Sequence, residues 1–237
     1  VCDEVCAGLD SVGIRMPSHP VVREFFRLGA VPFAAPSANL SGSPSPTNAQ
    51  DVFSDMNGRL PLILDGGESQ VGVESTVISV AGDQPILLRP GYITKEQMEA
   101  VLGEEVLLSP AILEKLKEGE RPRSPGMKYK HYAPKANITI LKGSLAQFAD
   151  HVKKAADQPG VWCLCFDGEE KLLPVPCVTY GIKGDGVSQA HELFRSLREL
   201  DEKGAQTVYA RCPELDGVSM AVYNRLIRAA AFRVVEL

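Results

Sequence analysis

The sequence predicts an α/β fold, and three observations support this prediction. Short apolar and β-branched runs alternate with segments that begin with helix-capping residues, and turn-rich Gly and Pro stretches separate them. The chain of 237 residues is long enough for two domains. A hydrophobic fraction of 44% is ordinary for a globular chain, and no apolar run approaches the roughly 20 residues of a membrane helix.

The expected strands are runs of three to six residues in which Val, Ile and Leu dominate. Polar or Gly-rich turns bound them, as in sheets whose strands are joined by helices. In the first half they cover residues 11–15, 31–35, 62–64 and 76–80, with a further strand ending at Arg89; in the second half they cover 138–141, 161–166, 178–182, 208–210 and 233–235.

Helix starts are indicated by three capping boxes, in which a hydroxyl and a Gln three residues later each satisfy a free backbone N–H. They lie at residues 47–50, 94–97 and 144–147. Two longer helices are expected over about 188–203 and 219–231. On the last of these, the face carrying Tyr223, Asn224, Arg225 and Arg228 is expected to pack the second domain on the first.

A basic, proline-rich stretch divides the chain. Its sequence is LKEGERPRSPGMKYKHYAPK, and it shows neither a helical nor a strand period. We therefore expect a first domain over residues 1–105, a linker over 106–136 and an α/β domain over 137–237. Composition alone favours a solvated basic connector, although its arginines, lysines and tyrosines would also suit a segment that covers an anionic ligand.

Charge and cysteine content narrow the class of protein. The net charge of −5 excludes a generally basic nucleic-acid coat, and none of the six cysteines lies in a C-x-x-C pair that would indicate zinc. Cys163 and Cys165 are expected to face the core from one side of a strand. A cytoplasmic protein with reduced thiols is expected, because six cysteines are too few for a disulfide scaffold in a chain of this length.

Polar residues that follow the predicted strands are candidate ligand contacts. Arg15 closes an apolar run, where its planar guanidinium could bind a carboxylate or form a salt bridge at the sheet rim. Ser37, Asn39 and Ser45 lie in a loop rich in Ser and Pro, which is either a phosphate cradle or an ordinary surface loop. Ser75 follows a Gly-rich turn, and Arg89 ends the next strand.

The sequence contains neither a P-loop nor a G-x-G-x-x-G motif. No Ser-His-Asp arrangement or glycosidase-like pair of carboxylates is evident, so no covalent nucleophile is identified. Arginines and hydroxyls at the ends of strands instead favour the binding and positioning of phosphates and carboxylates.

Taken in order, five segments resemble the threonylcarbamoyl-AMP synthases in their two-domain form. They are SVGIRMPSHP, APSANLSGSPSPT, GVESTVISV, LRPG and SPGMKYKHYAP. The run AVYNRLIRAA near the end is similar to the second domain of the same family. The resemblance implies a YrdC-like twisted-sheet domain linked to a smaller Rossmann-like α/β domain.

The resemblance implies a nucleotidyltransferase that makes threonylcarbamoyl-AMP and pyrophosphate from L-threonine, bicarbonate and ATP. Mg²⁺ would accompany ATP. Other threonylcarbamoyl transferase proteins would then pass the group to an adenosine next to the anticodon of certain tRNAs. Double-stranded RNA or tRNA is a further partner that the resemblance suggests.

The same resemblance assigns the site residues. Arg15 and Ser75 would bind threonine. The linker would close over the active site, which overturns the simple connector reading. Residues matching ATP-binding positions are Ser11, Ala35 through its backbone, Ser37, Asn39, Ser45, Arg89, His131 and Tyr132.

One departure from the family leaves an alternative. The family's first strand and loop, with a threonine-contacting Thr and a Lys/Arg motif for the triphosphate, are not found before Ser11. The chain is therefore expected to lack the N-terminal part of the YrdC-like domain. The alternative is an inactive or truncated module that binds nucleotide or double-stranded RNA. A carbamoyl transferase of hydrogenase maturation is disfavoured, because that family carries zinc-finger-like segments and this sequence has no C-x-x-C pair.

Overall fold

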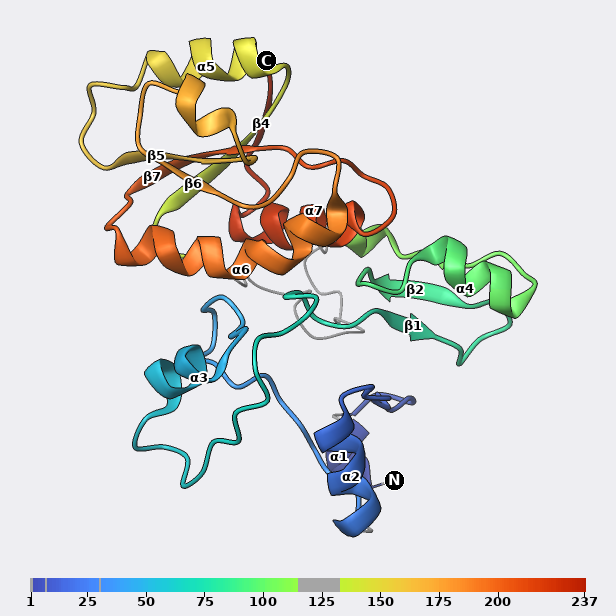
Figure 1. Ribbon diagram of the computed structural model, residues 1–237. Helices are drawn as coiled ribbons and strands as arrows, with labels where there is room; N and C mark the ends of the chain where they lie inside the picture. The colour runs from blue at the N-terminus through green and yellow to red at the C-terminus, as the bar shows by residue number, and fades with distance from the viewer. Residues whose placement is uncertain (1, 7, 30, 115–132) are drawn as a thin grey trace. The chain divides into compact units, whose positions relative to one another are not determined.

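The computed structural model describes residues 2–6, 8–29, 31–114 and 133–237 (Figure 1). The chain divides into two compact units, Val1–Ser37 and Ala38–Leu237. In the described ranges, no helix is long and apolar enough to cross a membrane. The domain limits expected from the sequence remain a prediction, and most of the expected linker lies outside the described residues.

The first unit contains α1 (Asp3–Cys6) and α2 (Pro20–Gly29). The ring of Phe33 packs on two rings of α2, with its centroid 4.9 Å from that of Phe25 and 5.4 Å from that of Phe26. The strands predicted over 11–15 and 31–35 are wrong. Neither run belongs to a sheet within the described residues, and an apolar run becomes a strand only where a neighbour completes its backbone hydrogen bonds.

The main sheet of the second unit has, among the described residues, five strands in the order β6-β5-β7-β4-β8, with every pair parallel. Its strands are β4 (Asn137–Lys142), β5 (Val161–Cys165), β6 (Cys177–Thr179), β7 (Thr207–Arg211) and β8 (Val234–Glu236). All five predicted strands of this half are thus present, although β6 ends three residues earlier than expected. The parallel sheet with its crossover helices confirms the α/β prediction.

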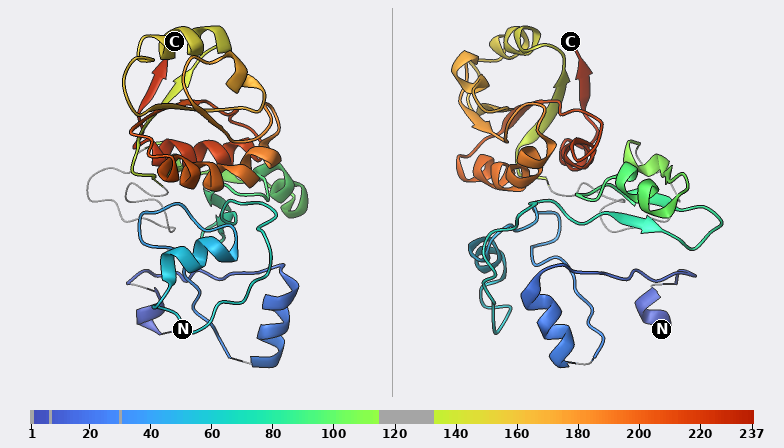
Figure 2. Two further views of the ribbon diagram at one scale, coloured as in Figure 1. Left: turned by 60° about the vertical axis from the view of Figure 1, so that its left-hand side comes forward. Right: turned by 45° about the vertical axis from the view of Figure 1, so that its right-hand side comes forward.

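Helices cover both faces of this sheet, as the views in Figures 1 and 2 agree. α5 (Leu145–Lys153) lies on one face, and α6 (Gly186–Glu202) and α7 (Ser219–Ala229) lie on the other. A short 3₁₀ helix, η2 (Glu169–Leu172), follows β5. Residues of a strand alternate between the two faces, so each strand contributes to both cores.

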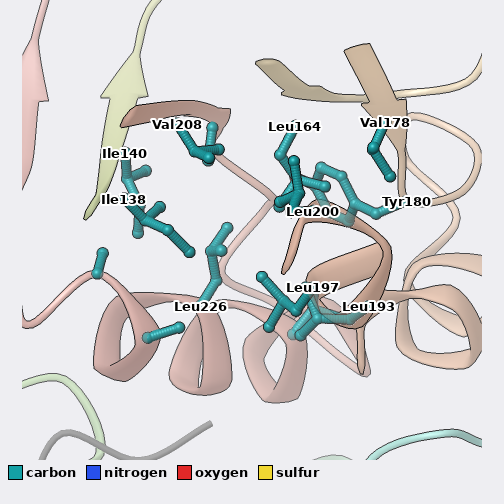
Figure 3. Packing of buried hydrophobic residues seen from close by; sticks show 14 of the residues in the cluster. Ile138, Ile140, Leu164, Val178, Tyr180, Leu193, Leu197, Leu200, Val208 and Leu226 are labelled. Carbon is teal, nitrogen blue, oxygen red and sulfur yellow. The ribbon is translucent and has the colours of Figure 1, made fainter. Parts of the chain in front are cut away.

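The larger core lies between the sheet and helices α6 and α7 (Figure 3). Leu193 and Leu197 project from α6 toward the sheet, and Leu226 does so from α7. The sheet side chains that they meet are fully buried, and include Ile138, Ile140, Leu164 and Val208. Burial of this continuous apolar layer is the main source of stability for the region.

The opposite face of the sheet packs on α5. Phe148 and Val152 of this helix belong to one buried cluster with Leu141 and Cys163. Cys163 and Cys165 are fully buried, which confirms that they are core residues.

A second, smaller sheet has the order β1-β2-β3. It comprises β1 (Val77–Ser79), β2 (Ile86–Arg89) and β3 (Leu107–Leu108). In the chain, β3 lies between α4 (Lys95–Leu102) and the 3₁₀ helix η1 (Pro110–Ile112). The helix α3 (Ala49–Met56) precedes all three strands. Leu87, Val106 and Ile112 form its core, on which Met220 of α7 packs. α7 therefore contacts both sheets.

The capping predictions were correct at two of three positions. Thr94 and Ser144 form complete capping boxes at the starts of α4 and α5. The box predicted from Thr47 is wrong, because the neighbouring Asn48 caps α3 by accepting a hydrogen bond from the Asp51 amide. The strand predicted over 62–64 is also wrong: this run joins no sheet in the part of the chain that the structure describes.

We predict that Leu197→Ala lowers the free energy of unfolding by about 2–5 kcal/mol, because it leaves a cavity in the larger core. Chemical denaturation followed by circular dichroism measures the change. Leu172→Ala is the matched control, since that leucine is 66% exposed. An equal effect of both substitutions would contradict this description of the core.

Candidate active site

The loop that carries Asn39 and Ser45, two of the predicted nucleotide contacts, is held by its own polar groups. We call residues 38–47 the serine loop. The Asn39 side-chain amide donates to the carbonyl oxygens of Leu40 at 2.8 Å and Ser43 at 3.2 Å. The Ser43 amide donates to Leu40 O at 3.1 Å. Gly42 has a φ of +92°, a conformation that glycine adopts without steric cost.

A glutamate that follows a Gly-rich turn joins this loop to α7. The Ser45 hydroxyl donates to Glu74 Oε1 at 2.6 Å, and Arg225 Nε donates to Glu74 Oε2 at 2.7 Å. A second nitrogen of Arg225 donates to the backbone carbonyl of Glu74 at 3.1 Å. The Arg225 side chain is fully buried, so its charge requires this carboxylate partner.

The surroundings of Glu74 keep its carboxylate ionised. Burial alone would raise the pKa of Glu74, but the charge of Arg225, the Ser45 hydroxyl and the charge of Arg89 together hold that pKa below its ordinary value. Because the Ser45 hydroxyl donates its hydrogen bond to the Glu74 carboxylate, the lone pairs of Ser45 Oγ remain to accept a hydrogen bond from a ligand.

Arg89 and Ser75 meet at the end of β2. The Arg89 guanidinium donates to the Ser75 backbone carbonyl from Nε at 3.2 Å and from Nη2 at 3.0 Å. Ser75 itself is exposed, whereas Arg89 is buried. Ser75 and Arg89, which the sequence analysis placed near the ends of successive strands, thus lie together. The two hydrogen bonds from Arg89 fix the backbone that carries the Ser75 hydroxyl.

A second ion pair supports the serine loop from α6. Arg198 Nη2 donates to Asp55 Oδ2 at 2.9 Å and to the backbone carbonyl of Pro44 at 2.6 Å. Asp55 Oδ2 also accepts a hydrogen bond from the Leu40 amide at 3.3 Å. The Arg198 hydrogen bonds are the main reason that the pKa of Asp55 lies below its ordinary value.

The expected face of α7 does pack on residues from the first half of the chain. The Asn224 side-chain amide donates to Ile112 O at 2.6 Å, and Arg228 Nη2 donates to Ala111 O at 2.6 Å. Asn224 and Arg228 therefore bond to residues of the expected linker, and Arg225 bonds to Glu74 of the expected first domain. Packing of one domain on the other stays a prediction, like the domain limits themselves. The carbonyl oxygens of Ala111 and Ile112 in η1 thus have their hydrogen-bond donors on α7.

The remaining predicted site residues are divided between the first unit and the linker. In the first unit, Ser11, Arg15, Ala35 and Ser37 are all exposed. His131 and Tyr132 lie outside the described residues. The Ala133 amide donates to Gly42 O of the serine loop at 3.2 Å.

Protein ligands for a metal ion are sparse at this site. Over the residues that the structure describes, no group of three or more His, Cys, Asp or Glu side chains could hold a metal ion. Both oxygens of Glu74 are engaged by Ser45 and Arg225. Mg²⁺ often binds through substrate phosphates and water with few protein ligands, so this donor set fits a metal that is held mainly by ATP.

The fold and this loop define an α/β protein with a hydroxyl-rich loop that two ion pairs, Arg225–Glu74 and Arg198–Asp55, hold in place. Two family models match consecutive parts of the chain. Residues 1–91 match a family described as telomere recombination, and residues 93–231 match the C-terminal domain of threonylcarbamoyl-AMP synthase. The chain belongs to the threonylcarbamoyl-AMP synthase family.

Individual relatives agree with this assignment. The chain is 44% identical over 237 residues to the threonylcarbamoyl-AMP synthase of Bacillus subtilis, covering 98% of this chain and 66% of that protein. It is 37% identical over 245 residues to the synthase of Pyrococcus abyssi, covering 98% of this chain and 68% of that protein. The chain thus spans about two thirds of the length of these relatives.

Solved structures show the same fold. The P. abyssi Sua5 structure complexed with L-threonine matches with a TM-score of 0.85 at 35% identity, over 97% of this chain and 67% of that one. A variant of that protein, with adjacent histidine and tyrosine residues changed to alanine, matches with a TM-score of 0.89 at 33% identity, over 100% of this chain and 68% of that one. The two-domain resemblance inferred from the sequence is confirmed.

Sequence reasoning missed the residues that hold the serine loop. Glu74 stands inside the segment that carries the resemblance, but its type alone does not reveal a partner 151 positions away. Asp55 and Arg198 lie on helical segments of ordinary appearance, 143 positions apart. The one available signal was the arginine-bearing face of α7, which the sequence analysis did single out.

We predict that Gly91→Ala destabilises the protein by about 1–3 kcal/mol, because an added Cβ would collide with the backbone nitrogen of Thr76. Gly82→Ala is the control, because a Cβ at that position meets nothing within 4 Å. Urea denaturation measures both changes. Equal stability of the two variants would show that the backbone beside Ser75 does not pack as closely as described.

Proposed function

We propose that this chain carries the threonylcarbamoyl-AMP synthase activity of its family. In this reaction the amine of L-threonine combines with bicarbonate to give a carbamate and water, and a carbamate oxygen then displaces pyrophosphate from the α-phosphate of ATP. The observation that carries the proposal is the match to the P. abyssi Sua5 structure complexed with L-threonine, at 35% identity over 97% of this chain. The activity is a proposal because the chain spans two thirds of that protein.

Threonine is assigned to Arg15 and Ser75. The guanidinium of Arg15 is exposed and planar, so it can donate two parallel hydrogen bonds to the amino-acid carboxylate. Ser75 presents an exposed hydroxyl on a backbone that Arg89 fixes. A fixed hydroxyl of this kind can orient the substrate without losing much conformational freedom on binding.

ATP is assigned to the serine loop and its neighbours. Ser45 can accept a hydrogen bond, because its proton is committed to Glu74. Asn39 Oδ1 is buried and has no hydrogen-bond partner among the described residues, so it too is free to accept one. Ligand groups that donate, such as a ribose hydroxyl or an adenine amine, match both atoms. The other assigned residues are Ser11, the Ala35 backbone, Ser37, Arg89, His131 and Tyr132.

No protein nucleophile is needed for this chemistry, because the reacting groups all belong to the substrates. The contribution of the protein is to hold them together and to neutralise charge on the phosphates. Mg²⁺ bound by the ATP phosphates would polarise the α-phosphate and favour the departure of pyrophosphate.

The product is a mixed anhydride that transfers its acyl group readily. We propose that tRNA-modifying threonylcarbamoyl transferase proteins accept it, in the cytoplasm. Binding of tRNA or double-stranded RNA by this chain is a separate proposal. A steep fall of RNA affinity with salt would support it.

We predict that the wild-type chain releases pyrophosphate from ATP and bicarbonate only when L-threonine is present. Arg15→Met is expected to raise the KM for threonine roughly tenfold or more, because a charge-assisted hydrogen bond to the carboxylate is lost. A coupled pyrophosphate assay measures both effects.

Arg23→Met is the control for this experiment, since Arg23 is an exposed arginine of the same unit. It should leave the KM for threonine unchanged. Release that ignores threonine would refute the substrate assignment, and no release by the wild-type chain would refute the activity. Normal threonine kinetics in Arg15→Met would refute the role of Arg15.

A further inference from the structure

We call residues 137–237, which form the five-stranded parallel sheet and its helices, the parallel-sheet region. Two arginines of this region bond to the serine loop or to its partners from different helices. Arg225 of α7 reaches it through Glu74, and Arg198 of α6 reaches it through Asp55 and the Pro44 carbonyl. Neither side chain is open to a ligand, because Arg225 is fully buried and the side chain of Arg198 is 15% exposed. The hydrogen bonds given above for both arginines are made to groups of the protein itself.

We propose that Arg198 and Arg225 are positioning residues, through which the parallel-sheet region holds the serine loop in the shape that binds ATP. The inference rests on the proposed function in assigning ATP to this loop. The parallel-sheet region would then influence the affinity for ATP, although neither arginine contacts the nucleotide.

The Arg225 side sets the direction of one hydrogen bond. Glu74 uses Oε2 for Arg225 and Oε1 for the Ser45 hydroxyl, so a single carboxylate is bound from both ends. Arg225 also donates to the Asn224 side chain at 2.8 Å, which fixes its guanidinium plane. Without Arg225, the Glu74 carboxylate would lack its positively charged partner. It would then no longer fix the direction of the hydrogen bond from the Ser45 hydroxyl.

The Arg198 side sets the backbone of the same loop. Asp55 accepts from the Leu40 amide, and Asp51 accepts from the Thr47 amide at 3.1 Å, so both ends of the loop are bonded to carboxylates of α3. Arg198 fixes Asp55 and at the same time bonds the Pro44 carbonyl between them. The loop is therefore held at its two ends and in its middle.

A third buried ion pair provides a matched control. Arg211 Nε lies 3.0 Å from Glu169 Oε2, and Arg211 Nη1 donates to Gly143 O at 2.8 Å. All three residues belong to the parallel-sheet region, and none contacts the serine loop. Breaking this pair also leaves a buried charge uncompensated, but it should not change the loop.

The inference predicts a local change in backbone protection. In the full chain, Glu74→Gln and Asp55→Asn should each speed hydrogen exchange of the Leu40, Ser43 and Thr47 amides roughly tenfold or more, because each removes a charge-assisted hydrogen bond that keeps the loop closed. Asp55→Asn serves as the second variant if Glu74→Gln fails to fold. Glu169→Gln should leave exchange in the loop unchanged.

The same variants separate positioning from general stability. With ATP as the varied substrate, Glu74→Gln and Asp55→Asn should raise KM roughly tenfold while kcat at saturating ATP falls much less. Glu169→Gln should leave both values unchanged at a temperature where all the variants are folded. Arg198→Lys should preserve neither the loop protection nor the KM of the wild-type chain, because lysine lacks the planar fork that bonds both Asp55 and Pro44.

The outcomes decide the inference separately from the proposed function. Unchanged loop exchange in both variants would overturn it, as would faster exchange with unaltered ATP affinity. If the wild-type chain releases no pyrophosphate, the synthase proposal fails. In that case the dissociation constant for ATP replaces KM. Calorimetry on the same variants then decides whether the arginines position the loop, because weaker ATP binding than in the wild-type chain supports the inference and equal binding overturns it.

Discussion

The contact between Arg225 and Glu74 is the interaction on which the arrangement of this protein depends. It joins a helix of the parallel sheet to a residue 151 positions earlier in the chain, beside the smaller sheet. A fully buried guanidinium cannot stand alone, so the position of α7 determines where Glu74 lies. Glu74 in turn orients Ser45, and its neighbour Ser75 is fixed by Arg89.

The other contacts of α7 reinforce this connection. Asn224 and Arg228 bond the carbonyl oxygens of η1, and Met220 packs on the core of the smaller sheet. An apolar interface would supply stability with less specificity, because it tolerates small shifts. Hydrogen bonds to defined carbonyl and carboxylate oxygens allow one register only. The orientation of the Ser45 hydroxyl assigned to ATP thus depends on a helix that carries none of the assigned residues.

The sequence predicted the parallel sheet well because its strands are buried on both faces. Such strands read as continuous apolar runs, and Ile138, Leu164 and Val208 show this pattern clearly. Residues 11–15, 31–35 and 62–64 have a similar composition but join no sheet in the described structure, because pairing depends on neighbours that a local pattern does not reveal. Thr47 failed as a helix cap because Asn48, one residue later, caps α3 by accepting from the Asp51 amide, whereas the box predicted from Thr47 would have used the Gln50 amide.

The candidate site was predictable where it follows a family motif, and not where it depends on distant contacts. Ser45, Ser75 and Arg89 stand inside such motifs, whereas Asp55 and Arg198 stand in helices that any α/β protein could contain. The polarity of the Ser45 hydroxyl also escaped the sequence, because it is set by the charge of a residue 29 positions away. Side-chain hydrogen bonds of this kind become visible only in three dimensions.

The most direct test of the Arg225–Glu74 connection is a double-mutant cycle on ATP affinity, measured by calorimetry on Arg225→Met, Glu74→Gln and the double variant. We expect strong non-additivity, with a coupling of roughly 1–3 kcal/mol, because either change alone leaves a buried group without its partner. The double variant should bind ATP no more weakly than the weaker single variant. Additive losses would show that the two residues act on ATP independently, and would contradict the central role given to their contact.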